Sequence, residues 1–510
     1  MAIWGSRKQP PRFAFGVYFI ARINIAAVAM SQTQIKNDKR TVGLINLGCA
    51  KNQVDSEEML GLLKEEGHSV RFISSPQELA STTADVVIIN TCAFIESARE
   101  ESINTILEAV AQKQQGNVKK VVVVGCLAQR YPKELSEALP EVDAFLGTGQ
   151  IERVPNITQQ VLIRPSQLVE TVAHPHHRWV NVPTRVRWGT PWSAYLKISE
   201  GCDHTCTFCA IPSFRGRHVS KPFERIIEEA HQLAAQGVRE LNLIAQDSTQ
   251  YGYDLYKRPR LPELLKALSE IEELHWIRLF YCYPSRVNDE LIETLATTQK
   301  ICHYIDMPLQ HADNAILRKM RRPMSYQGYI ELLQKFRNAM PDAAIRTTFI
   351  VGFPGESEAH FATLERFLEE AQFDRVGVFT YSVEEGTPAA TMRPKVSERV
   401  KMQRRERLMA RQQTISYERN RRWIGRPLEV LIEGRSPLDP TTAIGRSFRD
   451  GPEVDGKVYV KRCFANPGTF ITARITEARA YDLIGEPIES HTTTLPHSSL
   501  LSTAKHSTAS

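Results

Sequence analysis

The sequence predicts an α/β protein with an N-terminal α/β parallel-sheet domain, a central partial (βα)6 barrel and a C-terminal small antiparallel β-barrel. Three observations support this fold class. The 510 residues, 42% of them hydrophobic, exceed what one small module needs. From residue 41 to about residue 381, apolar runs alternate with amphipathic stretches, which is typical of parallel sheets covered by helices. After residue 426, short β-rich runs separated by Gly and Pro replace that alternation, as in small β-barrels.

The N-terminal domain is expected over residues 39–155. Its buried strands are predicted at 41–47, 85–90 and 121–124, and helices with apolar spacing at 54–66 and 97–115. Residues 156–190 contain three prolines and no regular period, which predicts a linker.

The central barrel is expected over residues 191–392. Six strands are predicted at 195–198, 240–245, 276–281, 303–307, 346–351 and 376–381, with crossover helices such as 222–236 and 325–340. A basic helical connector is expected at 393–425, because residues 393–422 hold eleven Arg or Lys against three Glu. The small barrel is expected at 426–490, with strands at 428–432, 458–460 and 470–475, and a disordered tail at 491–510.

The composition and the N-terminal region indicate a cytoplasmic protein without a membrane anchor. Nine cysteines with no clean secretory signal fit a reducing cytosol better than a disulfide framework. The apolar stretch 13–30 is interrupted by Arg22 and Asn24 and predicts neither a membrane span nor a signal peptide. Residues 1–38 are expected to be disordered or to precede the true start, with Met30 as an alternative initiator. The absence of acidic residues in 1–37 leaves a transit peptide open.

Cys202, Cys206 and Cys209 follow the first barrel strand in Cys-x3-Cys-x2-Cys order. Three thiolates within eight residues can bind one iron-sulfur cluster and leave one iron open for a substrate or cofactor. Zinc would normally require a fourth ligand, and His204 lies in the loop where it would be crowded. The position also fits a catalytic role, since functional groups of βα barrels gather at the carboxyl ends of the strands.

Cys49, Cys92 and Cys126 each follow the end of a predicted parallel strand. The carboxyl ends of such strands share one edge of the sheet, so three separate thiols can meet there as a second cluster site. On this argument alone, a chance occurrence of three cysteines at strand ends is about as probable as a shared cluster site. The other cysteines, Cys282, Cys302 and Cys463, lie in or beside apolar runs and are expected in the core.

Four motifs resemble those of the radical S-adenosylmethionine methylthiotransferases. They are residues 46–52, 90–95, 125–132 and 201–209, the last with an aromatic, Phe208, before its final cysteine. The resemblance covers roughly residues 40–490, including the order of an auxiliary-cluster domain, a radical barrel and a terminal barrel of the TRAM type. It implies two 4Fe-4S clusters, one held by Cys49, Cys92 and Cys126 and one by Cys202, Cys206 and Cys209, together with S-adenosylmethionine.

Residues 199–203, 210–220 and 451–456 resemble the branch that modifies a protein. That branch implies addition of a methylthio group to the β-carbon of an aspartate in ribosomal protein twelve of the small subunit. One S-adenosylmethionine would methylate a sulfur at the auxiliary cluster, and a second would supply the radical. The alternatives are methylthiolation of a transfer-RNA adenosine by the same clusters, and a non-catalytic iron-sulfur carrier.

Further residues are candidates for contacts with S-adenosylmethionine, while no catalytic residue is expected beyond the cluster ligands. Phe208 belongs to the cysteine motif, Gln246 or Asp247 ends the second barrel strand, Gln310 follows the fourth and Gly352 follows the fifth. A plain turn is the alternative for the glycine segment around Gly352.

The partners expected with this chemistry are a small-subunit ribosomal protein, an electron donor of the flavodoxin or ferredoxin kind and a sulfur donor. Residues 426–490 carry nine Arg or Lys and ten Asp or Glu. This slightly negative net charge does not favour binding to RNA phosphates. The basic helix indicates the opposite and would permit contact with ribosomal RNA, although a solvated helix is the commoner case.

Overall fold

The computed structural model describes residues 39–171, 175, 177, 179 and 185–488. The chain divides between Arg411 and Gln412 into two compact units, each of which is described by itself. The predictions for residues 1–38 and 491–510 lie outside the described residues. Within the described ranges, no helix combines the length and the apolar character needed to cross a membrane.

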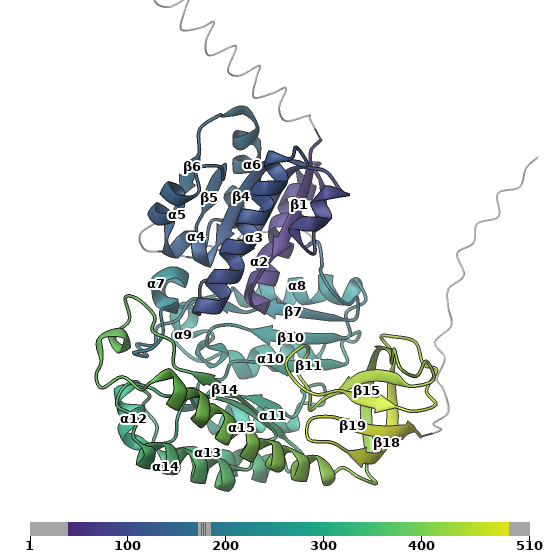
Figure 1. Cartoon of the computed structure of the whole chain (residues 1–510). Coiled ribbons are helices and arrows are strands. Elements are labelled where there is room, and N and C mark those ends of the chain that lie inside the picture. The colour runs from purple at the N-terminus through teal and green to yellow at the C-terminus, as the bar shows by residue number, and fades with distance from the viewer. Residues whose placement is uncertain (1–38, 172–174, 176, 178, 180–184, 489–510) are drawn as a thin grey trace, which may run out of the picture. The chain divides into compact units, whose positions relative to one another are not determined.

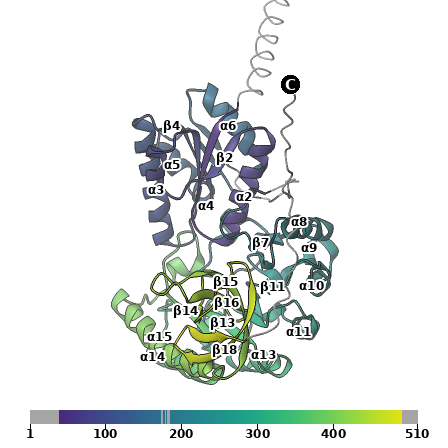
Figure 2. The same cartoon turned by 90° about the vertical axis from the view of Figure 1, so that its right-hand side faces the viewer.

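The N-terminal domain is a six-stranded parallel sheet in the order β2-β1-β3-β4-β5-β6 (Figure 1). Its strands are β1 (Thr41–Asn46), β2 (Ser69–Phe72), β3 (Ala84–Thr91), β4 (Val118–Gly125), β5 (Ala144–Leu146) and β6 (Leu168–Glu170). Its helices are α2 (Ala50–Glu65), α3 (Glu96–Gln114), α4 (Cys126–Arg130), α5 (Pro132–Ala138) and α6 (Val154–Ile163), with short 3-10 turns at Pro76–Ala80 and Ile151–Arg153. Helix α3 covers one face of the sheet, and α2 and α6 cover the other (Figure 2). The three strands and two helices predicted from the sequence are therefore confirmed, within a few residues at their ends.

The prediction of a linker over 156–190 is wrong for its first part. Helix α6 and strand β6 occupy that stretch, and β6 pairs in parallel with β5 as the last strand of the sheet. Ile157 and Val161 of α6 are buried against the sheet, which gives the segment a place in the core. Pro165 lies between the two elements, so it marks a turn and not an unstructured segment.

The central barrel consists of two sets of three parallel strands, β11-β10-β7 and β12-β13-β14. The strands are β7 (Ser193–Lys197), β10 (Glu240–Ile244), β11 (Trp276–Leu279), β12 (Tyr304–Asp306), β13 (Ala344–Val351) and β14 (Arg375–Thr380). A parallel bridge between Ile277 and Ile301 joins the two sets. All six predicted strands are thus confirmed as one partial barrel.

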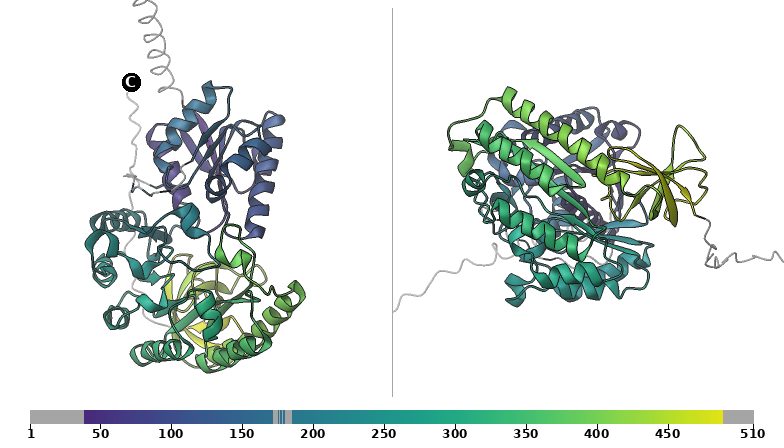
Figure 3. Two further views of the ribbon diagram at one scale, coloured as in Figure 1. Left: turned by 90° about the vertical axis from the view of Figure 1, so that its left-hand side faces the viewer. Right: turned by 90° about the horizontal axis from the view of Figure 1, so that it is seen from below.

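Helices lie on the outside of these strands, as the right panel of Figure 3 shows. They are α8 (Phe223–Ala235), α10 (Leu261–Ser269), α11 (Asp289–Thr297), α13 (Tyr326–Ala339) and α14 (Glu358–Ala371). Short elements complete the region: β8 (Ser199–Glu200) paired with β9 (Val219–Ser220), α7 (Ile211–Arg215), α9 (Tyr253–Tyr256), α12 (Asn314–Lys319) and 3-10 turns at Ser248–Gln250, Pro284–Arg286 and Pro388–Thr391.

Helix α15 (Glu398–Arg421) forms the connector that the basic segment predicted. In its first half, Arg404 is buried and donates to Glu356 over 2.8 Å, and Arg407 pairs with Glu358 and Glu365 at 2.6 and 2.7 Å. Part of the basic charge of this helix is therefore neutralised by the barrel's own carboxylates.

The second unit contains a closed five-stranded barrel in the order β15-β16-β17-β19-β18. Its strands are β15 (Pro427–Arg435), β16 (Ala443–Ser447), β17 (Val458–Val460), β18 (Phe470–Ala478) and β19 (Leu483–Pro487). The small barrel and its three predicted strands are confirmed. Strands β16 and β19 were not predicted, because their apolar runs are short and are interrupted by Gly445 and Gly485.

Candidate active site

The three strand-end cysteines, Cys49, Cys92 and Cys126, lie at one edge of the N-terminal sheet. Cys49 caps α2 after β1, Cys92 directly follows β3, and Cys126 begins α4 after β4. Because β1, β3 and β4 are neighbours in the sheet, their carboxyl ends bring the cysteines side by side. The structure thus places these residues at one edge of the sheet, and their role as ligands of one cluster stays a prediction.

Close packing around Gly48 and Asn52 shapes this edge. Gly48 has φ +93°, and a Cβ there would lie 2.8 Å from the Cβ of Cys92. Asn52 is fully buried and donates through Nδ2 to the carbonyl oxygens of Leu47 and Thr91 at 2.9 and 3.0 Å. One amide side chain therefore ties the end of β1 to the end of β3.

Burial and mutual repulsion act on the strand-end thiols. Burial raises the pKa of Cys126 to about 12, and the Arg215 guanidinium, whose Nε lies 3.2 Å from its Sγ, acts in the opposite direction. Burial also raises the pKa of Cys92, and the nearby Cys49 adds to that effect. The charges of Cys49 and Cys92 likewise raise the pKa of Cys126, so each strand-end thiolate disfavours the others.

The loop cysteines, Cys202, Cys206 and Cys209, directly follow β8 near the carboxyl end of β7. Gly201 has φ +78°, and any Cβ there would collide with the Arg217 carbonyl, so only glycine fits. The backbone N–H of Cys202 donates to Gly216 over 3.1 Å, and that of Cys209 to Cys206 over 3.1 Å. Burial raises the pKa of Cys209 to about 12 and that of Cys202 further.

His204 lies within this loop but has partners other than the thiols. Its Nε2 is 2.6 Å from Asp247 Oδ2, and its ring stacks on Tyr283 with centroids 3.5 Å apart. The Arg322 guanidinium also lies over Tyr283, and its Nη1 is 3.8 Å from the Cys206 Sγ. Asp247 is therefore engaged with His204, and its role toward S-adenosylmethionine stays a prediction.

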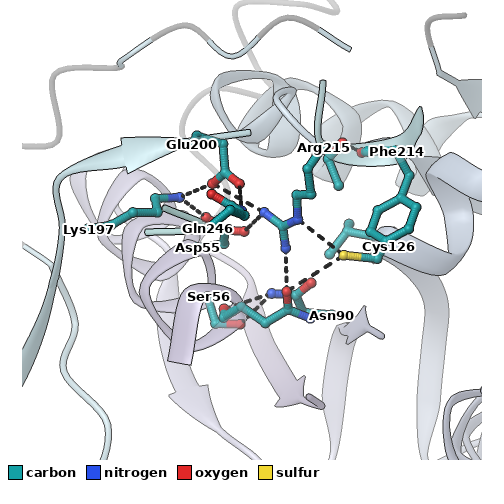
Figure 4. Close-up of polar contacts among 12 residues, drawn as sticks. Asp55, Ser56, Asn90, Cys126, Lys197, Glu200, Phe214, Arg215 and Gln246 are labelled. Carbon is teal, nitrogen blue, oxygen red and sulfur yellow. Dashed lines mark hydrogen bonds and ion pairs between the residues drawn. The ribbon is translucent and has the colours of Figure 1, made fainter. Parts of the chain in front are cut away.

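Arg215 connects Cys126 of the N-terminal domain to Glu200 of the barrel region through a buried ionic network (Figure 4). It ends α7, six residues after Cys209. Its Nη1 lies 2.8 Å from Asp55 and 3.3 Å from Glu200, while its Nη2 donates to Asn52. The arginine that follows one set of cysteines therefore contacts a cysteine of the other set.

Lys197 completes this network on the barrel side. It is fully buried and pairs with Asp55 of α2 and with Glu200, the latter at 3.0 Å. Burial alone would lower the pKa of Lys197, but Asp55 and Glu200 raise it above its ordinary value. Burial would likewise raise the pKa of Glu200, but Arg215 and Lys197 hold it well below its usual range. Lys197 and Glu200 are thus held charged.

A second group of ion pairs, centred on Glu384, joins the N-terminal domain to the barrel. Glu384, which follows β14, accepts from Arg99 of α3 over 2.6 Å and from Arg130 of α4 over 2.9 Å. Arg130 and Glu384 are both largely buried, so water screens this contact little.

The four residues predicted to contact S-adenosylmethionine lie around the same mouth of the barrel. Gln246 follows β10 and donates to Glu200, Gln310 follows β12 at φ +74°, and Gly352 directly follows β13. Phe208 packs against the small apolar cluster that contains Phe353. Their role toward the cofactor stays a prediction. Cys282, Cys302 and Cys463 are buried, as expected.

Sequence reasoning missed Lys51, Asn52, Asp55, Lys197, Glu200 and Arg215 as site residues. Helix α2 carries one signal that could have revealed them. Its first half is a run of polar residues, and the structure buries Lys51, Asn52, Asp55 and Glu58. A polar helix face normally lies in water, so such a face becomes informative only when a second domain covers it.

The donor set fits iron-sulfur clusters. Each site offers three free cysteines, and each iron of a cluster takes one cysteine as its thiolate. In the part of the chain that the structure describes, no three Cys, His, Asp or Glu side chains are arranged to bind one single metal ion.

Comparison with known proteins agrees with this division. Residues 41–147 match the family described as "Uncharacterized protein family UPF0004", residues 196–368 the radical SAM superfamily and residues 424–488 the TRAM domain. The ribosomal protein uS12 methylthiotransferase RimO of Geobacter sulfurreducens is 46% identical over 89% of this chain and 100% of its own. The RimO protein of Caldanaerobacter subterraneus subsp. tengcongensis is 47% identical over 88% of this chain and 100% of its own.

A solved structure shares the fold. The radical S-adenosylmethionine methyltransferase TsrM from Kitasatospora setae superposes with a TM-score of 0.51 at 16% identity, over 69% of this chain and 77% of its own. At that identity the likeness concerns the fold alone.

The barrel, the cysteine loop and the family matches define a radical S-adenosylmethionine enzyme that uses 4Fe-4S clusters. The flanking domains and the full-length relatives narrow the class further. The chain belongs to the RimO family of methylthiotransferases.

Proposed function

We propose that this protein adds a methylthio group to the β-carbon of an aspartate in ribosomal protein uS12. The observation that carries the proposal is the presence of two three-cysteine groups within one compact unit, with Arg215, six residues after Cys209, in contact with Cys126. The full-length match to uS12 methylthiotransferases supplies the substrate. An aspartate β-carbon carries an unactivated C–H bond, which ordinary acid-base side chains do not attack.

We assign Cys202, Cys206 and Cys209 to the radical cluster, and Cys49, Cys92 and Cys126 to the auxiliary cluster. The bound clusters and S-adenosylmethionine supply the radical, the sulfur and the methyl group. The protein's own residues place these parts: Gly201 permits the tight entry of the cysteine loop, Asn52 ties the strand ends together, and Arg215 holds the two sites to each other.

The mass of ribosomal protein uS12 from a strain that lacks this gene tests the function. The protein should lose the mass of one methylthio group, and expression of the intact gene should restore it. Loss of a methylthio group from transfer-RNA adenosine, with uS12 unchanged, would instead establish the transfer-RNA alternative. The relatives give that alternative no support.

A reaction with purified protein separates an enzyme from a cluster carrier. The reconstituted protein, dithionite and S-adenosylmethionine should release deoxyadenosine, whereas a carrier would release none. Adding a peptide that contains the substrate aspartate should then give a methylthiolated product.

The further partners in this proposal are a flavodoxin- or ferredoxin-type electron donor, a sulfur donor and the cytoplasmic ribosome. Contact of the first half of α15 with ribosomal RNA would fall to exposed residues such as Arg405. Arg404 is unsuitable as a probe of that contact, since it is buried against Glu356. Reversal of charge at Arg405 alone should weaken ribosome association if the contact exists.

A further inference from the structure

Lys51 is a lysine of the N-terminal domain that reaches the mouth of the central barrel. It lies in the first turn of α2, two residues after Cys49, and only 8% of it is exposed. Its Nζ donates to the Ala245 carbonyl over 3.3 Å and lies 3.5 Å from the centre of the Tyr281 ring. Ala245 directly follows β10 and Tyr281 follows β11, so the ammonium lies where the barrel strands end.

Lys51 differs from the other buried cations around it. Lys197, Arg215, Arg185 and Lys221 all have carboxylate partners, at Asp55, Glu200, Glu57 or Glu229. Among the described residues, no carboxylate lies within 4.0 Å of the Lys51 ammonium. The charges of Glu200 and of the Cys49 sulfur also act on the Lys51 ammonium. Its close partners are nevertheless only a carbonyl oxygen and an aromatic face, and these compensate a buried charge only in part.

The residue beneath Lys51 is held in an uncommon conformation. Tyr281 has φ +60°, which is unfavourable for a bulky residue, and its N–H donates to Asp306 Oδ2 over 3.0 Å. Such strained positions concentrate at ligand sites. This hydrogen bond fixes the backbone of the residue whose ring supports the ammonium.

A second polar atom at the same strand end lacks a partner. Gln246 follows Ala245, and its Oε1 is buried without a hydrogen-bond donor, while its Nε2 donates to Glu200. The Gln246 Oε1 acceptor requires a hydrogen-bond donor, and the Lys51 ammonium attracts a negative group. A ligand that carries both a donor and a negative group would satisfy both.

We propose that Lys51 binds a carboxylate at the mouth of the barrel. Two molecules of the reaction carry one: the substrate, as the side chain of the target aspartate, and S-adenosylmethionine, in its methionyl part. Assignment to the aspartate rests on the proposed function, whereas assignment to S-adenosylmethionine does not. In either case the N-terminal domain supplies a binding group to a ligand of the barrel.

The test compares Lys51→Met with wild-type protein, both loaded with iron and sulfide. Met keeps most of the apolar stem and removes the charge. Equilibrium dialysis without reductant measures the Kd for S-adenosylmethionine. Fluorescence anisotropy measures the Kd for a labelled uS12 loop peptide with the target aspartate, and for the same peptide with asparagine there.

One of these Kd values should rise about 30-fold or more, which is the loss expected for one partner of a buried charge pair. A rise for S-adenosylmethionine alone identifies the methionyl carboxylate. A rise for the aspartate peptide alone, with the wild-type preference over the asparagine peptide abolished, identifies the substrate. If all three values stay within about twofold of wild type, the proposal is overturned.

Two further variants protect the result. Lys51→Arg keeps the charge and should recover most of the affected affinity, whereas a merely space-filling role would not favour Arg over Met. Lys119→Met removes an exposed lysine from the opposite end of the same sheet and should change none of the values. A loss of bound iron in Lys51→Met that Lys51→Arg does not repair would also overturn the proposal, because the residue would then serve the protein's assembly.

The outcome for the wild-type protein separates this proposal from the function. If wild-type protein produces no methylthiolated peptide, the proposed function fails. The S-adenosylmethionine arm would still decide whether Lys51 binds a carboxylate.

Discussion

The strand-end cysteines and the loop cysteines bring three thiols together by different means. The loop cysteines lie within eight residues, and the backbone of one turn sets their spacing. The strand-end cysteines are separated by more than thirty residues at each step and meet only because β1, β3 and β4 are neighbours. The first site therefore depends on local geometry, and the second depends on the pairing of an entire sheet. We therefore expect the two sites to respond differently to substitution.

The largest effect is expected for Cys206→Ala at the loop site. Two thiolates are too few to retain a stable four-iron cluster, so bound iron should fall from about eight to about four atoms per chain. Deoxyadenosine and methylthiolated peptide should both fall to background. A variant that keeps all its iron and still cleaves S-adenosylmethionine would refute the assignment of the loop cysteines.

Cys92→Ala should remove only half of this chemistry. The auxiliary cluster is lost, but the loop cysteines hold their own cluster, and deoxyadenosine should still form while methylthiolation falls to background. Parallel quantification of both products in one reaction is the measurement. Unimpaired methylthiolation would return Cys92 to the status of an ordinary buried thiol.

Arg215→Met should weaken the connection between the sites without removing any cysteine. The change leaves Asp55 and Glu200 buried with Lys197 as their remaining close cation, and loss of one partner in a buried ion network costs about 3–5 kcal/mol. Urea unfolding of the full chain measures this loss of unfolding free energy.

The matched control is Arg217→Met, two residues further along. Arg217 is 82% exposed and pairs only with Asp203 at the surface, so its unfolding midpoint should not move. Equal effects of the two substitutions would show that the buried network contributes nothing special.

The smallest effect is a difference in thiol reactivity in iron-free protein. Cys49 is exposed and Cys206 half-buried, whereas burial raises the pKa of Cys126 and Cys209 to about 12 and so removes their reactive thiolate at pH 8. Brief iodoacetamide treatment followed by peptide mass spectrometry should label Cys49 first and Cys206 next. Early labelling of Cys126 would mean that the strand-end site opens on its own.

Most of the fold could be predicted from the sequence, because most strands and helices leave a pattern within a few consecutive residues. Parallel strands such as β3 and β4 are continuous apolar runs, and the cysteine loop is one contiguous motif. The strand ends were also predictable, since every parallel strand ends at the same edge. Short strands with glycine, such as β16 and β19, carry too few residues for a periodic signal.

The contacts between domains could not be predicted. Asp55 and Lys197 are 142 residues apart, and nothing near either one shows that they share a buried ion pair. The same holds for Lys51, whose place above Tyr281 depends on how the helix packs against the barrel. Local patterns specify each domain's own core, and the polar surfaces between domains appear only in the assembled chain.

The contact of Arg215 with Asp55 and Cys126 also limits which domains can be exchanged between related proteins. A chimera that takes its first 170 residues from another protein would bury the arginine of one parent against whatever the other parent has at these positions. Such hybrids should remain functional only when both ends of the network are transferred as matching sets. The two domains therefore have separate folds, but Arg215 makes their contact surfaces depend on each other.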